Sequence, residues 1–373
     1  MKTKIFIVGS FGESLLEFRG ALIRELIKNN YEISLAIPFK TTPIESIRYL
    51  ESIGVHLFNL KLERAKFTFF QDLHSMLQLI LLFLRIQPKI AIFYTIKPIV
   101  LGTLAASICF VPNKIQMFTG LGHIFTSKRK SFSIRFARLL TRLSTRLSTK
   151  YIFQNKDDAK LLRDLNFFKD DSKIYISNGS GVDLNKYSYK KPTSKDTLNI
   201  LMVSRIIEEK GIIEYIDAAK NITNSNLNIK FNLAGFFDEN PTSIKEIEFN
   251  ELTSFKNFNF LGKVANVTSI LEETDIFVLP SYREGTPRSV LEAMAIGRPI
   301  ITTNVPGCRE TVIDGENGFL IDAKSSEQII EKIQIYIDQP NLILKHGLQS
   351  RKIAESKYSD IAVAEGMVRF ISK

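Results

Sequence analysis

Short apolar runs alternate with amphipathic stretches of helical length along this chain, and the alternation occurs twice. In the first half, Lys4–Val8, Ile33–Ile37 and Ile90–Thr95 have the length of buried strands, and stretches such as Ser14–Lys28 have helical periodicity. Parallel strands need crossover connections, which are usually helices, so this pattern favours parallel sheets covered by helices. We therefore predict an α/β protein with two doubly wound domains facing a cleft.

The length of 373 residues also suggests two domains, each large enough to bury its own core. A polar break rich in Lys, Pro, Ser and Thr occupies residues 190–197. We expect a first domain over residues 1–182, a linker over 183–197 and a second domain over 198–356. Residues 357–373 are expected to form a helix that packs back towards the first domain.

Several classes of protein are disfavoured by composition. The two cysteines, Cys109 and Cys308, lie far apart and have no ligand or redox spacing, which indicates a reducing compartment. The first apolar run, Ile5–Val8, is too short for a secretory signal. The runs Leu77–Leu84 and Ile99–Val111 fall short of the roughly 18 to 20 residues that span a bilayer, so buried helices are expected there.

The net charge of +11 is distributed unevenly. Residues 1–190 carry a balance of +15 and residues 191–373 a balance of −4. The stretch from Leu73 to Lys156 has 13 Lys and Arg residues and no Asp or Glu. Such a surface is expected to face something anionic or to be fully hydrated.

The segment Val203–Gly211 follows the first predicted strand of the second domain and leads into its first helix. Arg205 and Lys210 lie in this turn, where helix N–H groups and two cations could bind one diphosphate. Solvated surface charges are the alternative explanation of the same pair.

A second segment, Leu279–Ala293, places Glu284 in a loop and Glu292 inside the helix that follows. Thr286 is expected to cap that helix, with Pro287 at its first position. The two carboxylates would then contact different parts of one extended ligand. An exposed helix charge is the alternative for Glu292.

Together these motifs resemble the retaining GT-B glycosyltransferases of glycosyltransferase family 4. The resemblance covers nearly all of the second domain. It rests on Arg205–Gly211, on Glu284 and Glu292 followed by Ala293–Pro299, and on Leu261–Lys263, Pro306–Gly307 and Asp314–Phe319. It implies two Rossmann-like domains and a UDP-sugar donor.

The resemblance also implies roles for individual residues. Arg205 and Lys210 would neutralise the donor diphosphate, Glu284 would hold hydroxyls of the transferred sugar, and Glu292 would bind the ribose. The remaining donor-binding positions would be the backbone of Gly285, Thr286, Pro287 and Arg288 around the sugar and phosphate, and Lys263 and Val264 beside the uracil.

The first domain contributes weaker signals. Gly9 and Gly12 lie in a turn after the first strand, where relatives bring the backbone close to the diphosphate and acceptor; an ordinary turn is the alternative. His123 follows another strand and would donate a hydrogen bond to the sugar or acceptor, and we expect it to be a catalytic residue.

A basic amphipathic helix is predicted within residues 128–150. At 3.6 residues per turn its apolar stripe and its arginines lie on adjacent faces. The stripe comprises Phe132, Phe136, Leu139, Leu140, Leu143 and Leu147, and the arginines are Arg135, Arg138, Arg142 and Arg146. This pattern is typical of helices that bind anionic membrane surfaces; a core-facing helix with a solvated basic face is the alternative.

Nucleic acid is a disfavoured partner for the basic stretch. The sequence has no zinc spacing, no RNA-binding aromatic signature and no Trp. The basic stretch is rich in leucine, whereas nucleic-acid surfaces interleave cations with stacking aromatics.

The function expected from these observations is transfer of a sugar from a UDP-sugar to an undecaprenyl-diphosphate-linked sugar, in O-antigen, capsule or glycan synthesis. The best candidate sugar is N-acetylgalactosamine or another N-acetylhexosamine. The protein would sit on the cytoplasmic face of a bacterial inner membrane, in contact with its anionic lipids. Because the sequence has no Asp-x-Asp pair, no metal or other cofactor is expected. The alternatives are a GT-B enzyme with another hexose or a soluble acceptor, and a non-catalytic membrane-binding protein.

Overall fold

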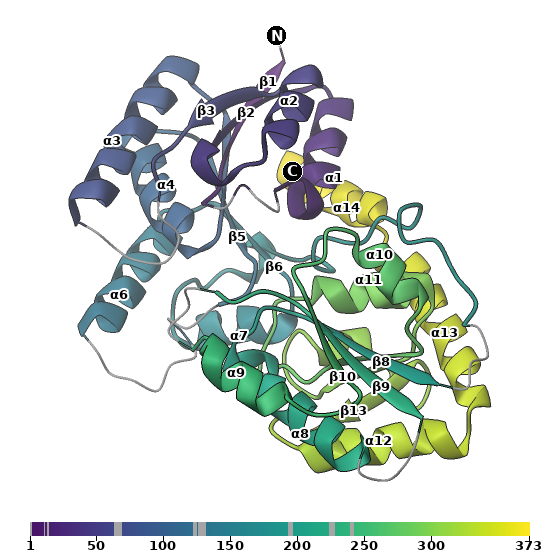
Figure 1. Ribbon diagram of the computed structural model, residues 1–373. Coiled ribbons are helices and arrows are strands. Elements are labelled where there is room, and N and C mark those ends of the chain that lie inside the picture. The colour runs from purple at the N-terminus through teal and green to yellow at the C-terminus, as the bar shows by residue number, and fades with distance from the viewer. Residues whose placement is uncertain are drawn as a thin grey trace. The chain divides into compact units, whose positions relative to one another are not determined.

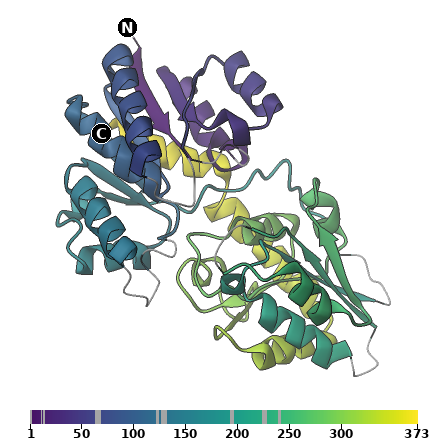
Figure 2. The same ribbon diagram turned by 60° about the vertical axis from the view of Figure 1, so that its left-hand side comes forward.

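The computed structural model describes residues 2–10, 12, 15–62, 69–121, 125, 132–192, 197–223, 228–238 and 242–373 (Figures 1 and 2). Contacts divide the chain into two compact units, residues 1–180 with 361–373 and residues 181–360. The predicted linker is therefore wrong in its first part. Tyr187 is buried and the Lys190 N–H donates to the Ile296 carbonyl at 3.0 Å, so residues 183–192 are packed into the second unit.

The described residues of the first unit form a seven-stranded parallel sheet in the order β3-β2-β1-β4-β5-β6-β7. Its strands are β1 (Thr3–Val8), β2 (Tyr31–Ile37), β3 (His56–Asn59), β4 (Ile90–Tyr94), β5 (Asn113–Phe118), β6 (Lys150–Phe153) and β7 (Ile174–Ile176).

Helices cover both faces of this sheet, and each face has its own apolar core. One core includes side chains from α3 (Phe69–Ile86), α4 (Ile96–Ile108), α6 (Phe132–Arg146) and α7 (Lys156–Asp164). The other includes side chains from α1 (Leu15–Lys28), α2 (Ile44–Ser52) and the C-terminal helix α14 (Asp360–Ser372). The last helix thus packs on the sheet formed by the first half of the chain.

The described part of the second unit forms a six-stranded parallel sheet in the order β10-β9-β8-β11-β12-β13. Its strands are β8 (Leu198–Val203), β9 (Ile229–Ala234), β10 (Phe258–Gly262), β11 (Ile276–Leu279), β12 (Ile300–Thr303) and β13 (Gly318–Ile321). Its helices are α8 (Ile212–Thr223), α9 (Glu246–Thr253), α10 (Val267–Glu272), α11 (Arg288–Ile296), α12 (Ser326–Asp338) and α13 (Asn341–Lys357).

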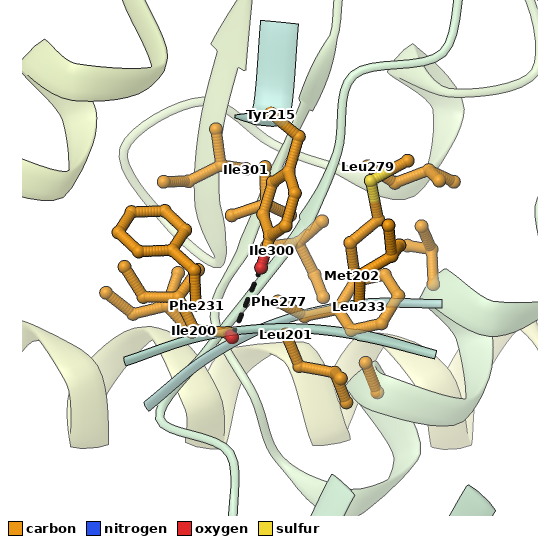
Figure 3. Packing of buried hydrophobic residues seen from close by; sticks show 14 of the residues in the cluster. Ile200, Leu201, Met202, Tyr215, Phe231, Leu233, Phe277, Leu279, Ile300 and Ile301 are labelled. Carbon is orange, nitrogen blue, oxygen red and sulfur yellow. Dashed lines mark hydrogen bonds between the residues drawn. The ribbon is translucent and has the colours of Figure 1, made fainter. Parts of the chain in front are cut away.

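The core of the second unit explains why its strands are continuous apolar runs. Parallel strands covered on both faces bury nearly every side chain, and Ile200, Phe231 and Phe277 are fully buried (Figure 3). The one polar atom of Tyr215 in this core is satisfied, because its hydroxyl donates to the carbonyl oxygen of Ile200 at 3.2 Å (Figure 3).

The predicted fold class, two doubly wound α/β units, is confirmed, but three local expectations are wrong. The strand β7 was not predicted, because it has only three residues and is half-buried. The first helix of the second domain, which we expect from the sequence over Glu209–Asn221, starts three residues later, after a short 3-10 turn, η3 (Glu208–Lys210). The run Leu77–Leu84 is buried on one side only: Leu79 and Phe83 of α3 are buried, whereas Leu77, Leu81 and Leu84 are 51%, 67% and 58% exposed. Within the described ranges, no helix is long and apolar enough to cross a bilayer.

Candidate active site

The turn after β8 positions Lys210 at the carboxyl edge of the second sheet. Gly211 joins η3 to α8 with a φ of +74°, which is left-handed backbone that glycine adopts without strain. A Cβ atom there would lie 2.2 Å from the carbonyl oxygen of Pro280. The turn can therefore pack directly on the loop after β11 only because residue 211 is glycine.

Lys210 forms an ion pair with Glu284 of that loop, and the two side chains are 17% and 13% exposed. The Ser281 hydroxyl donates to the same Glu284 oxygen, Oε1, at 2.9 Å. The structure thus brings two of the predicted site residues together from segments 74 positions apart.

The loop after β12 closes against Glu284 from the other side. The Glu284 N–H donates to the Pro306 carbonyl at 3.0 Å. Gly307 has a φ of +87°, and a Cβ on it would lie 2.3 Å from the Glu284 carbonyl oxygen. Three loops from the carboxyl ends of neighbouring strands therefore hold this carboxylate in place.

Arg205 forms an ion pair with Asp238, which follows β9. The two side chains are 29% and 19% exposed. Sequence reasoning missed Asp238, although an acid just beyond a buried strand on the same sheet edge as Arg205 is a signal that could have found it. Each predicted diphosphate-binding cation therefore has a carboxylate partner and remains partly accessible, and its role in binding a diphosphate stays a prediction.

Glu292 lies inside α11 and is 7% exposed, so the alternative of an exposed helix charge is wrong. Arg288 donates from Nε to Glu292 Oε1 at 2.9 Å, one helical turn away. The predicted cap at Thr286 is also wrong: Pro287 precedes the helix with a ψ of 110°, which is extended, and α11 starts at Arg288.

Lys263 and Val264 follow β10 on the same edge of the sheet. The Lys263 Nζ lies 5.5 Å from the centroid of the Phe236 ring, which follows β9. Val264 packs partly buried against the core of this unit. A cation and an aromatic ring are thus presented together where sequence reasoning expected the uracil.

Cys308, a residue that sequence reasoning did not connect with the site, lies fully buried after β12. Burial raises the pKa of its thiol to about 12, and the negative charge of Glu284 acts in the same direction. Hydrogen bonds with Thr302 and Thr303 oppose this shift. The wall behind Glu284 therefore contains a neutral thiol.

In the first unit, Gly9 and Gly12 are both required by close packing. A Cβ on Gly9 would lie 1.9 Å from the Tyr94 hydroxyl oxygen, and one on Gly12 would lie 1.7 Å from Thr42 Oγ1. Packing alone thus accounts for both glycines, as the alternative of an ordinary turn implies. Their donor-binding role stays a prediction.

Two further residues meet beside this turn, at the carboxyl ends of β1 and β4. Ser10 Oγ and Thr95 Oγ1 are 2.7 Å apart. Thr95 has a φ of +69° and a ψ of 153°, an unfavourable backbone conformation for a β-branched residue. Sequence reasoning found neither residue, and the predicted catalytic His123 lies outside the described residues.

The basic helix α6 presents its apolar stripe to solvent. Phe136, Leu139, Leu143 and Leu147 are between 45% and 52% exposed. The side of α6 that faces the protein carries small and polar residues instead, namely Ala137, Thr141, Ser144 and Thr145, and the buried Ser148 follows the helix. The alternative of a core-facing stripe is wrong, apart from Leu140, which packs partly buried on the core; the side chain of Phe132 lies outside the description.

The arginines of α6 are at least partly accessible. Arg135 and Arg146 are exposed, and Arg138 and Arg142 are intermediate. Arg142 donates from Nε to the Asn166 carbonyl at 3.2 Å. The helix therefore combines an exposed apolar row with a neighbouring row of cations.

Two family models match the chain. Residues 7–155 match the model described as glycosyl transferase 4-like, and residues 185–353 match the model described as glycosyl transferases group 1. The capsular polysaccharide biosynthesis glycosyltransferase CapM of Staphylococcus aureus is 28% identical, over 97% of this chain and 95% of its own length. An N,N'-diacetylbacillosaminyl-diphospho-undecaprenol alpha-1,3-N-acetylgalactosaminyltransferase of Campylobacter jejuni is 28% identical, over 91% of each chain.

Solved structures share the fold at lower identity. Anabaena HepE in complex with UDP and glucose aligns with a TM-score of 0.78, at 17% identity and 99% coverage of both chains. Sucrose-phosphate synthase of Thermosynechococcus elongatus aligns with a TM-score of 0.79, at 15% identity, over 100% of this chain and 98% of its own.

Proposed function

The chain belongs to the GT-B glycosyltransferases, and from that premise we propose that it moves a sugar from a UDP-sugar to a polyprenyl-diphosphate-linked sugar, with retention of configuration. The similarity to CapM and to the Campylobacter enzyme, whose name specifies a diphospho-undecaprenol acceptor, supports this choice of acceptor. HepE, which shares the fold, was solved with UDP bound.

The observation that carries the proposal is the pair of ion pairs at one edge of the second sheet. Arg205 with Asp238 and Lys210 with Glu284 place two cations on the same turn, each partly accessible. A diphosphate is the ligand that two such cations suit, because each phosphate can accept charge-assisted hydrogen bonds.

In the proposed step, the bond between the sugar C1 and the β-phosphate oxygen breaks as the acceptor hydroxyl oxygen bonds to C1 on the same face. The acceptor proton passes to the departing phosphate oxygen. Arg205 and Lys210 stabilise the negative charge that grows on UDP.

Glu284 and Glu292 bind hydroxyl groups in this scheme and neither is a nucleophile. Glu284 is held by Lys210 and Ser281, so its orientation towards sugar hydroxyls is set before the donor arrives. Glu292, which accepts a hydrogen bond from Arg288, would also accept hydrogen bonds from the ribose hydroxyls. The backbone of residues 285–288 would line the sugar and phosphate, and Lys263 with Val264 the uracil.

For the transferred sugar we propose N-acetylgalactosamine, on the strength of the Campylobacter relative. Another relative, from Escherichia coli, is named a galactosyltransferase acting on a GlcNAc-diphosphoundecaprenol, at 27% identity over 70% of this chain. Galactose is therefore the alternative that a donor panel must include.

The proposed place of action is the cytoplasmic face of a bacterial inner membrane, where a polyprenyl-linked acceptor is confined. The exposed apolar and basic rows of α6 support contact with anionic lipid. We propose that no metal takes part in donor binding, because Arg205 and Lys210 supply the positive charge that a metal would otherwise bring.

The proposal is tested by incubating the protein with a panel of UDP-sugars and a synthetic polyprenyl-diphosphate sugar, with product detected by mass spectrometry. Transfer from UDP-N-acetylgalactosamine is expected. Transfer only to water-soluble acceptors would favour the soluble-acceptor alternative, and the absence of both transfer and donor hydrolysis would favour the non-catalytic one.

A further inference from the structure

A row of leucines on α3 is exposed along the length of the helix. Leu73, Leu77, Leu81 and Leu84 are 42%, 51%, 67% and 58% exposed, and Phe70 precedes them at 84%. At about 100° per residue the four leucines fall within an arc of about 80°, so they form one stripe about 16 Å long. Single exposed leucines are common on protein surfaces, but a continuous stripe of this kind marks a binding surface.

The opposite side of α3 already supplies the core of its unit. Leu79 and Phe83 are buried in the cluster that α3 shares with α4, and Ser75 is fully buried. The exposed leucines are therefore additional to the residues that attach α3 to the protein. Their apolar character is not explained by folding.

The exposed leucine stripe of α3 carries no acidic side chain. Its acidic residue, Asp72, is buried and forms an ion pair of 2.6 Å with the buried Lys97 of α4. The charged residue on the exposed side is Arg85, near the end of the helix. The stripe therefore offers no negative charge to an anionic surface.

The helix α4 packs against both α3 and α6, so the two exposed apolar rows belong to one helical layer (Figure 1). The row on α6 from Phe136 to Leu143 is about 11 Å long, is continued by Leu147 just past the end of the helix, and is flanked by four arginines. A second copy of this chain would bring a second set of these arginines against the first, which is repulsive. An anionic bilayer complements both the charge and the apolar surface.

We propose that α3 is the element that inserts into the bilayer, with Leu73, Leu77, Leu81 and Leu84 entering the acyl boundary while the arginines of α6 bind lipid phosphates. This proposal rests on the lipid-linked acceptor of the proposed function and adds the helix that holds the first unit on the membrane. Attachment through α3 should depend little on salt, whereas the contribution of α6 should fall with salt.

The chain contains no tryptophan, so one introduced tryptophan reports on its own position. In Leu81→Trp, we expect a blue shift of the emission and strong quenching by brominated lipids in phosphatidylcholine vesicles that contain phosphatidylglycerol. In the control Ile247→Trp, on the exposed face of α9 in the second unit, we expect neither. Equal quenching at both positions, or none at position 81, would overturn the proposal.

Sedimentation with the same vesicles gives an independent measurement. Leu77→Ser/Leu81→Ser should bind vesicles about tenfold more weakly than the native chain. Its residual binding should disappear in high salt. The matched pair Ile247→Ser/Ile313→Ser, also exposed apolar residues, should bind normally. Thermal unfolding followed by circular dichroism verifies that each variant is folded.

Unchanged vesicle binding by Leu77→Ser/Leu81→Ser would refute the proposal. So would the finding that the native chain is a dimer and this variant a monomer, with both binding vesicles equally well. Neither assay requires turnover. If the chain binds vesicles through α3 but transfers no sugar, the proposed function is refuted and the proposal that α3 binds the membrane is retained.

Discussion

Arg205 forms an ion pair with Asp238, an acid on the neighbouring strand's loop, 33 residues further along the chain. This carboxylate pairs with one of the two cations proposed to bind the diphosphate. Asp238 and the diphosphate would then compete for the same guanidinium.

Replacement of Asp238 tests this competition. We expect Asp238→Asn to bind UDP about two- to tenfold more tightly, because Arg205 no longer has an anionic partner. Isothermal titration calorimetry with UDP measures the change. In the background of Arg205→Ala the same substitution should have little effect on affinity, since the guanidinium for which Asp238 and the diphosphate compete is gone. An equal effect of Asp238→Asn in both backgrounds would show that it does not act through Arg205.

Gly211 tests the geometry of the turn that carries Lys210. We expect Gly211→Ala to lower the free energy of unfolding by about 2 kcal/mol or more, because it combines left-handed backbone with a contact of 2.2 Å to Pro280. Urea denaturation measures it. The control Gly54→Ala has a φ of +85° and nothing within 4 Å, so it should suffer only the backbone strain. Equal losses in both variants would contradict the packing argument.

The buried thiol of Cys308 predicts a loss of stability in alkali. Its pKa is raised by burial from 9.0 to about 12, so the unfolded chain releases this proton at lower pH than the folded chain does. The contribution of the protonated thiol to the free energy of unfolding is fully present below about pH 9. It is smaller by about 1.4 kcal/mol at about pH 10.

Comparison with Cys308→Ala isolates this contribution from that of the buried tyrosines. The difference in unfolding free energy between the native chain and the variant should shrink from about pH 8 to about pH 10, as measured by urea titration. A difference that does not change with pH would contradict the assignment.

Charge supplied by side chains rather than by a metal predicts insensitivity to chelators. We expect the rate of sugar transfer to be unchanged in EDTA and not to rise with added Mg²⁺ or Mn²⁺. A rate that depends strictly on either ion would contradict the proposal that Arg205 and Lys210 take the place of a metal.

Much of the fold could be predicted because buried parallel strands are short apolar runs whatever their neighbours are. The strands β1, β2 and β4 match the predicted runs Lys4–Val8, Ile33–Ile37 and Ile90–Thr95 to within two residues at each end. Contacts between distant segments could not be predicted in this way. Asp238 meets Arg205, and Ser10 meets Thr95 across 85 positions, only because neighbouring strands end at one edge of a sheet.

The exposed faces of α3 and α6 show a second limit of prediction from the sequence. Periodicity finds an apolar row on α6, but whether the row faces the core depends on what the other side can bury. Here Thr141 and Ser144 fill that side: the Thr141 hydroxyl donates to the Ala137 carbonyl, and Gln116 of β5 donates to the Ser144 hydroxyl. Small residues that satisfy their own hydrogen bonds can line an interface as well as leucines can, so the pattern alone leaves both orientations open.

The central claim is that Arg205 and Lys210 stabilise the departing diphosphate, and turnover in single variants tests it most directly. With UDP-N-acetylgalactosamine and a synthetic polyprenyl-diphosphate sugar, Arg205→Ala and Lys210→Ala should each reduce kcat by about tenfold or more. Lys352→Ala, an exposed lysine of α13, serves as the control and should keep the native rate. Near-native kcat in both Arg205→Ala and Lys210→Ala would contradict the account.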